Sequence, residues 1–348
     1  MLRYSMSAAP RVLGVLAAVG VTACGLFGPG EHSDSKAAQL DSAFAEAGRL
    51  ANLTSLVVVH DGTVERQLYL NGGGADSAQD VRSVTKSVVS LLVGIALDRG
   101  CLQSLDGTLA DLLGPLAPAD TAKRGITLGQ LLNMTSGMGG DELANVDLYN
   151  QWALASDQLT YVWDLPLVAS PGSHFYYYSP NFYVAARIVT EACGEETAAW
   201  ARDVLFTPLG IGARAWETDD KGYSNGGAGL QLTPMDMVAI GSLVLDSGRA
   251  GGEQVVSSAW IRTATTATVG TTVEPNVTGY GYGWWIGQAG GARYVMAMGW
   301  GGQFIVAVPS KRLIVTATNR WQGVDRSTAN AQWFAIDTII LQRIVPAY

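Results

Sequence analysis

The chain has 348 residues, of which 48% are hydrophobic and only 15% are charged. A chain of this length and composition can bury a large core, which excludes an intrinsically disordered protein and predicts one compact two-lobed unit. Its formal net charge is -8, from 22 Lys and Arg against 30 Asp and Glu, with no basic run. This balance argues against nucleic acid as a partner and favours small neutral or cationic substrates.

The first residues predict an export signal. A short basic region precedes an apolar run, residues 12–21, that is too short to cross a bilayer. The run ends in Val-Thr-Ala-Cys24, which resembles the lipobox of bacterial lipoproteins, in which the cysteine is lipidated. We therefore expect a signal peptide over residues 1–23, a membrane lipid anchor at Cys24, a flexible tether over residues 24–36 and an extracytoplasmic location. An ordinary secretory signal peptide is the alternative.

The next hydrophobic patterns predict a helix and a hairpin. The helix covers residues 37–50, and two alternating apolar runs, residues 56–59 and 64–70, then flank an Asp61-Gly62 turn. A long apolar helix follows Ser83, and helical segments broken by glycine and proline continue to about residue 248.

The C-terminal third changes to a period of two. Four runs predict antiparallel strands and a last one predicts a closing helix: residues 280–286, 294–298, 304–308, 313–318 and 328–343. Strands at both ends of the chain predict an α+β fold, in which one antiparallel sheet built from both termini is flanked by helices and carries an inserted, mainly helical lobe. The domain of residues 37–348 then has an α/β lobe, about 37–82 and 250–348, and a helical lobe, about 83–249. The cleft between the lobes should hold the site.

Two cysteines follow Cys24, namely Cys101 and Cys193. In an oxidising compartment such an even pair could form a disulfide. Two buried free thiols are nevertheless the default expectation, because each cysteine follows an apolar helical pattern.

Ser83 and Lys86 stand one turn apart at the start of the apolar helix, which is the spacing of a Ser-Lys nucleophile. A serine hydroxyl needs a base, and a lysine can act as one when burial lowers its pKa. Ser33-Asp-Ser-Lys36 has the same spacing but no apolar helix to hold it. A helix-capping serine beside a solvated lysine is the alternative for Ser83.

Other catalytic patterns are weaker. Gly222-Tyr-Ser224-Asn-Gly226 matches the nucleophile elbow of α/β-hydrolases, but no buried strand precedes Ser224 and no histidine follows it. The 3 histidines of the chain are scattered, so we expect no metal site and no cofactor.

The helix sequence Ser83-Val-Thr-Lys-Ser-Val-Val-Ser-Leu-Leu-Val-Gly-Ile-Ala resembles the active-site helix of the serine β-lactamase and penicillin-binding superfamily. The nearest branches are class C-type β-lactamases, carboxylesterases and 6-aminohexanoate-dimer hydrolases. Further segments match in the same order, at residues 53–62, 126–137, 229–236 and 299–309. The resemblance implies a β-lactamase/transpeptidase-like fold and an acyl-enzyme on Ser83, with Lys86 as general base.

The resemblance also implies a catalytic tyrosine within residues 171–181. The usual distance from the proline selects Tyr177, the middle one of three consecutive tyrosines, as the acid/base partner. Relatives often have an asparagine two positions later, where this chain has Ser179, with Asn181 two further on. We expect both to bind substrate, and this departure resembles the esterase and amide-oligomer hydrolase branches more than a true β-lactamase.

A third family element is Lys-Thr-Gly, or a His-containing equivalent, on an edge strand that faces the serine. Here Trp300-Gly301-Gly302 occupies the place. Tryptophan has no positive charge, so a substrate recognised there by its carboxylate, such as a penicillin, should bind poorly. The main-chain amides of Ser83 and Gln303 are expected to form an oxyanion hole, with Gly302 allowing close backbone approach.

The sequence thus predicts a serine hydrolase of small esters or amides. The alternatives are a β-lactamase or D-Ala-D-Ala peptidase, which Trp300 disfavours, and a catalytically silent binding or sensor domain of the same fold.

Overall fold

A computed structural model describes residues 29–271 and 276–348, so the predicted signal peptide and Cys24 lie outside the described residues. Helix α1 spans Pro29–Ala47. Residues 29–36 are therefore helical, and the predicted tether is wrong over this part. A proline does not prevent a helix from starting, because the N–H groups of the first turn have no helical partner. No helix in the described part of the chain is both long and apolar enough to cross a membrane.

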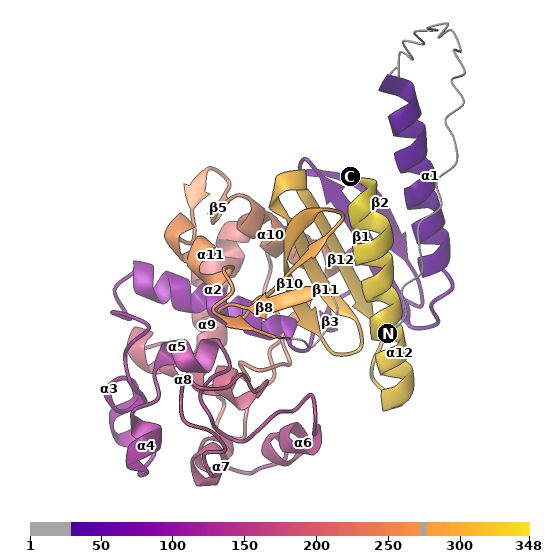
Figure 1. Ribbon diagram of the computed structural model, residues 1–348. Coiled ribbons are helices and arrows are strands. Elements are labelled where there is room, and N and C mark those ends of the chain that lie inside the picture. Colours follow the sequence, from indigo (N-terminus) through magenta and orange to yellow (C-terminus); the bar gives the residue numbers. More distant parts are fainter. Residues whose placement is uncertain (1–28, 272–275) are drawn as a thin grey trace, which may run out of the picture.

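An eight-stranded antiparallel sheet forms the centre, in the strand order β2-β1-β12-β11-β10-β9-β8-β7 (Figure 1). Strands β1 (Leu53–His60) and β2 (Thr63–Tyr69) form the predicted hairpin. β1 also pairs with β12 (Leu313–Asn319), so strands from the two ends of the chain are neighbours. The predicted α+β fold, with a sheet built from both ends, is confirmed.

The other half of the sheet corrects one prediction. Its strands are β7 (Val269–Gly270), β8 (Val277–Tyr280), β9 (Trp285–Ala289), β10 (Ala292–Gly299) and β11 (Gln303–Val308). The single strand predicted over residues 280–286 is wrong, because β8 ends and β9 begins within it. Gly283 turns the chain there with φ of 83°, a backbone conformation that glycine adopts without strain.

Helices cover the sheet and build the second lobe. α2 packs against β10 and β11 on one side and against α8 on the other, so it bridges the sheet and the helical lobe. Figure 1 shows α1 and α12 to the right of the sheet and α3 to α9 gathered below and to the left of it. The bounds are α2 Val84–Asp98, α3 Leu109–Leu113, α4 Thr121–Arg124, α5 Leu128–Leu132, α6 Asp147–Ala153, α7 Gln158–Asp164, α8 Pro180–Cys193, α9 Thr197–Ala201, α10 Pro234–Leu245, α11 Ser258–Ala264 and α12 Arg326–Ile339.

Short strands join these parts. β3 (Gln79–Asp80) pairs with β4 (Gln231–Leu232), just before α2 begins. β5 (Arg249–Ala250) pairs with β6 (Glu253–Gln254) beyond α10. The β3–β4 pair therefore fixes the chain immediately ahead of Ser83.

The two cysteines meet where α2 and α8 end. Cys101 and Cys193 are half-buried free thiols that contact each other as hydrogen-bonding partners. Burial, followed by the neighbouring Cys101, raises the pKa of the Cys193 thiol. The two cysteines are thus free thiols, as the default expectation had it, although they are half-buried rather than fully buried.

Candidate active site

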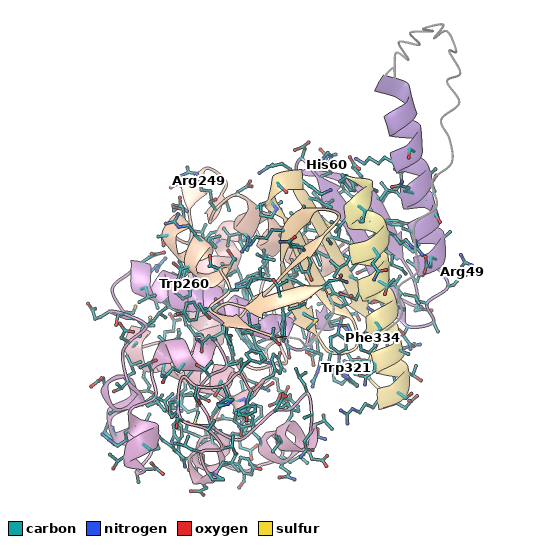
Figure 2. The ribbon with its side chains drawn as sticks, viewed as in Figure 1. Arg49, His60, Arg249, Trp260, Trp321 and Phe334 are labelled. Atoms are coloured by element: carbon teal, nitrogen blue, oxygen red, sulfur yellow. The ribbon has the colours of Figure 1, made fainter. Side chains whose placement is uncertain are left out.

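A pocket opens at the N-terminal end of α2, where the sheet meets the helical lobe. Its volume is about 400 Å³, and Ser83 lies in its wall. Five of its 14 lining residues are aromatic, namely Tyr149, Tyr177, Trp300, Trp321 and Trp333. Figure 2 shows Trp321 at the end of the sheet that faces the helical lobe. The pocket thus lies between the lobes, as the sequence predicts.

Lys86 lies behind Ser83 and is only 1% exposed. Its Nζ donates hydrogen bonds to Ser83 Oγ at 2.8 Å, to Ser179 Oγ at 2.9 Å and to the Gly227 carbonyl at 2.7 Å. Burial lowers the pKa of Lys86 to about 7, against an opposing effect of Glu142. The neutral amine is therefore populated near neutral pH. The alternative of a solvated lysine beside a capping serine fails, since the Ser83 side chain caps no backbone N–H group.

Glu142, which the sequence did not predict as a site residue, completes this polar core. Its Oε1 and Oε2 accept hydrogen bonds from the main-chain N–H and the hydroxyl of Ser179, both at 2.7 Å. Burial raises the pKa of Glu142, against the attraction of Lys86. A continuous chain of hydrogen bonds thus runs from Ser83 through Lys86 and Ser179 to Glu142. No pattern marked Glu142, which lies in a segment without regular secondary structure.

The third partner of Lys86 comes from a glycine-rich loop. A Cβ atom on Gly227 would lie 2.9 Å from the Ser179 carbonyl oxygen, and one on Gly226 would lie 2.1 Å from the Phe182 carbonyl oxygen. Glycine therefore allows the approach that brings the Gly227 carbonyl to Lys86. Ser224, in the elbow-like pattern of the same loop, donates its hydroxyl to Glu196 and does not line the pocket.

Tyr177 faces Ser83. The phenol contacts Ser83 as a hydrogen-bonding partner, and Lys86 Nζ lies 4.9 Å from the centroid of its ring. The ring stacks on Trp285 at 5.5 Å between centroids. Burial raises the pKa of Tyr177, so the phenol keeps its proton at neutral pH.

The other tyrosines of the run point elsewhere. Tyr176 stacks on His174, with ring centroids 6.0 Å apart. The ring of Tyr178 is fully buried and lies against Gly139. The geometry therefore places Tyr177, rather than its two neighbours, at the serine.

Two predicted site residues do not reach the pocket with their side chains. Asn181 is fully buried in the first turn of α8 and accepts a hydrogen bond from Ser136 Oγ at 2.8 Å, so its predicted contact with substrate is wrong. The chain enters α8 at Pro180, which leaves Ser179 at the site and turns Asn181 into the lobe. The Gln303 side chain bonds the main chain of Asn319 at 2.9 and 3.1 Å. Any role of Gln303 as an oxyanion donor therefore rests on its main-chain amide.

Trp300 lines the pocket from the turn between β10 and β11. The predicted edge strand is wrong, because β9, β8 and β7 continue the sheet beyond β10. Trp300 Nε1 donates to Asn330 Oδ1 at 2.9 Å. Gly302, with φ of 94°, has no room for a Cβ atom beside Asn319. A Cβ atom on Gly299 would lie 2.3 Å from the Val81 carbonyl oxygen, so the turn packs on the chain just before the serine.

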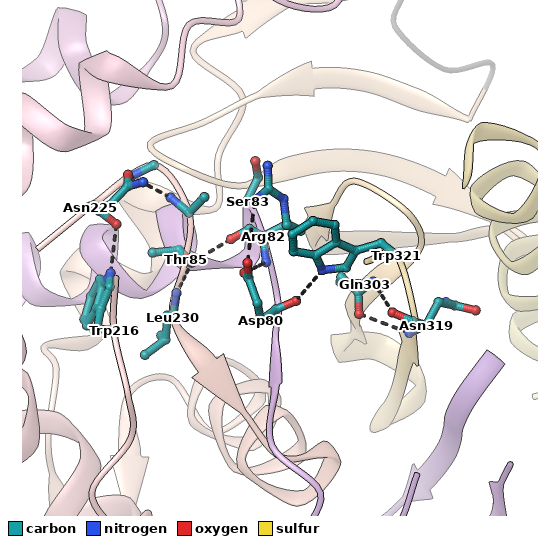
Figure 3. Close-up of polar contacts among 12 residues, drawn as sticks. Asp80, Arg82, Ser83, Thr85, Trp216, Asn225, Leu230, Gln303, Asn319 and Trp321 are labelled. Atoms are coloured by element: carbon teal, nitrogen blue, oxygen red, sulfur yellow. Dashed lines mark hydrogen bonds and ion pairs between the residues drawn. The ribbon is translucent and has the colours of Figure 1, made fainter. Parts of the chain in front are cut away.

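A cation that the sequence did not predict as a site residue also lines this pocket. Arg82, directly before Ser83, has a left-handed backbone with φ of 52°, and its N–H donates to Asp80 Oδ1 at 2.7 Å. Its guanidinium carbon lies 4.4 Å from the ring centroid of Trp321 and 5.3 Å from that of Tyr149. Figure 3 shows Arg82 beside Ser83, Asp80 and Trp321.

Among residues 29–271 and 276–348, no cluster of His, Cys, Asp and Glu is arranged to hold a metal ion. The polar groups gathered at the pocket suit proton transfer to and from a serine hydroxyl.

Comparison with known proteins shows to which family the chain belongs. The Beta-lactamase family model matches residues 43–337. The chain belongs to the beta-lactamase family. Penicillin-binding protein 4 of Amycolatopsis lactamdurans is 33% identical over 137 residues, covering 39% of this chain and 35% of that protein. The 6-aminohexanoate-dimer hydrolase of Paenarthrobacter ureafaciens is 26% identical over 225 residues, covering 60% and 55%. The matches thus span about a third to a half of these curated relatives.

Solved structures show the same fold for this beta-lactamase family member. EstCE1, a hydrolase with promiscuous acyltransferase activity, superposes with a TM-score of 0.67 at 18% identity, covering 87% of this chain and 98% of that chain. The predicted membership of the serine β-lactamase and penicillin-binding superfamily is therefore confirmed.

Proposed function

We propose that the protein is a serine hydrolase that cleaves small esters or amides through an acyl-enzyme on Ser83. The observation that carries the proposal is the 2.8 Å hydrogen bond between Lys86 Nζ and Ser83 Oγ, in a setting where burial lowers the pKa of the lysine to about 7. The hydrolases among the relatives support the same class of reaction.

In the first step, neutral Lys86 takes the Ser83 proton as Oγ bonds to the substrate carbonyl carbon. An ammonium has three donors, which match Ser83, Ser179 and Gly227. The neutral amine keeps two donors for Ser179 and Gly227 and presents its lone pair to Ser83. The carbonyl oxygen becomes an oxyanion at the N-terminal end of α2, where the amides of Ser83 and Gln303 are the expected donors.

In the second step, the tetrahedral intermediate expels the alcohol or amine, which needs a proton. Tyr177 is the expected donor because its raised pKa keeps the phenol protonated. Lys86, whose Nζ lies 4.9 Å from the centroid of the ring, is the expected source of the replacement proton. Water then attacks the acyl carbon while Lys86 takes a proton from it. The bond from that carbon to Ser83 Oγ breaks, Lys86 returns the proton to Ser83 Oγ, and the acid is released. Trp300, which has no charge, disfavours a β-lactamase or D-Ala-D-Ala peptidase.

A fluorophosphonate probe tests the proposal on the purified protein. We expect labelling at one serine, loss of labelling in Ser83→Ala and normal labelling in the matched control Ser224→Ala. Labelling of Ser83→Ala would contradict the mechanism. An unlabelled wild-type protein that turns over no ester would favour the silent binding or sensor domain.

We also propose that the mature protein is exported and held at the bacterial membrane by a lipid on Cys24. A single acyl chain gives only marginal membrane binding, so a diacylated cysteine is an adequate anchor. Cys24→Ala should move the protein from the membrane to the soluble fraction and abolish lipid incorporation. Unchanged membrane association of this variant would leave another attachment as the better account.

A further inference from the structure

Arg82 brings a positively charged side chain to the wall of the pocket in a protein of net charge -8. Three charged side chains line the pocket, namely Arg82, Arg326 and Glu142. Glu142 is already committed to Ser179 by two hydrogen bonds. The two arginines are therefore the charged groups free to meet an incoming molecule, and they favour a negatively charged one. The negative net charge of the whole chain suggests the opposite, a neutral or cationic substrate.

The guanidinium of Arg82 is held in place, but not all of its N–H groups have a hydrogen-bond partner in the protein. Its contact with Asp80, Nη1 to Oδ2, is 3.5 Å long, beyond the range of a strong charge-assisted hydrogen bond. Tyr149 contributes a further hydrogen bond, and Glu217 adds a more distant negative charge. Nε has no hydrogen-bond partner although it is buried. A guanidinium has five N–H groups, so donors remain for a ligand.

The backbone of Arg82 points to a positional role. A left-handed conformation is strained for a residue with a side chain, and such strain persists where the surroundings enforce it, often at functional sites. Here Asp80 holds the Arg82 N–H, and the rings of Trp321 and Tyr149 contact the guanidinium. Cation–π contacts fix a guanidinium and leave its N–H groups for acceptors.

We propose that Arg82 binds a carboxylate of the substrate, so that the preferred substrates are small esters or amides that carry a negatively charged acyl chain. This inference rests on the proposed hydrolase function and names its substrate class. The cation comes from the segment before the nucleophile and not from the β10–β11 turn, where Trp300 stands. An arginine suits this task because its planar fork matches the two oxygens of a carboxylate.

A matched pair of esters tests the inference. Mono-p-nitrophenyl adipate and p-nitrophenyl hexanoate have the same leaving group and acyl length and differ in a terminal carboxylate against a methyl group. Rates with Ser83→Ala are subtracted as background. We expect the wild-type kcat/KM to favour the adipate ester at least ~10-fold, the ratio that one charge-assisted hydrogen bond supports.

Variants of Arg82 then test whether this residue causes the preference for the adipate ester. Arg82→Met should lower the adipate-to-hexanoate ratio about 10-fold, mainly through KM, because the carboxylate lies away from the reacting carbonyl. Arg82→Lys should keep part of the ratio, since it keeps the charge and loses the fork. Arg320→Met is the matched control, because Arg320 bonds Asn52 and does not line the pocket. Its ratio should equal that of the wild type.

The outcomes separate this inference from the proposed function. A wild-type enzyme that is labelled at Ser83 and cleaves the hexanoate ester without preferring the adipate would overturn the role of Arg82 alone. An unchanged ratio in Arg82→Met would do the same and make the arginine structural. Absence of both labelling and ester turnover would overturn the hydrolase function itself. Should Arg82→Met fail to fold, the wild-type ratio and Arg82→Lys still decide.

Discussion

The two walls of the pocket differ in kind. The wall behind Ser83 is polar and buried, and each of its groups, Lys86, Ser179 and Glu142, has its hydrogen bonds made within the protein. The wall from the sheet side is aromatic, with Trp300 and Trp321 in edge-to-face contact at 6.1 Å. Proton transfer needs fixed polar partners, whereas substrate selection depends on shape and charge at the open side. Changes on one wall should therefore alter the rate of chemistry, and changes on the other should alter which substrate reacts.

The largest effect should come from the polar wall. Lys86→Met removes the base that receives the Ser83 proton, and we expect kcat for p-nitrophenyl esters to fall at least ~1000-fold. Steady-state hydrolysis measures this loss. Lys311→Met, remote from the pocket, is the control and should keep the wild-type rate. A Lys86→Met protein with near-normal turnover would assign the base to another group.

The next effect should come from the aromatic wall. Short-chain p-nitrophenyl esters should be hydrolysed with kcat/KM at least ~100-fold above that for penicillins, because a missing charge-assisted hydrogen bond from the Trp300 side costs about 2–3 kcal/mol. Trp300→Lys should narrow this gap. Efficient nitrocefin turnover by the wild-type protein would contradict the preference, and Arg82 would then be the first candidate for the carboxylate-binding cation.

The smallest effect should come from the charge of Glu142, which acts on the pKa of Lys86 within the polar wall. Negative Glu142 raises the pKa of Lys86, so Glu142→Gln should move the acid limb of the kcat/KM profile to lower pH. The base form exists above the lysine pKa, so activity should still rise with pH through that limb. The rate on the plateau should fall about 10-fold, because Ser179 loses an ionic acceptor. A matched control is Glu253→Gln, since Glu253 is an exposed carboxylate on β6 that does not line the pocket. If the acid limb does not shift, Glu142 does not set the pKa of Lys86.

Local patterns made part of this molecule predictable. The hairpin of β1 and β2 and the Ser83-Lys86 pair depend on spacings of a few residues, which a sequence displays directly. Glu142 and Arg82 gave no such signal, because the partners that place them at the site, Ser179 for Glu142 and the rings of Tyr149 and Trp321 for Arg82, lie far along the chain. The matching segment at residues 299–309 predicted that Trp300 faces the serine, and Trp300 does line the pocket. Only the pairing of β10 with β9 shows that its strand is internal and not at an edge. The predicted contact of Asn181 with substrate was also wrong, because the start of α8 decides which way this side chain points.

The three partners of Lys86 Nζ, at residues 83, 179 and 227, come from segments widely separated in sequence. In a chain that has not closed its helical lobe onto α2, this lysine would be solvated, with an ordinary pKa above 10 and a bound proton at neutral pH. Such a chain contains the serine and the lysine but has no base. The proposed catalysis would therefore require complete folding, and the recovery of the proposed esterase activity after refolding would time the docking of the helical lobe onto α2.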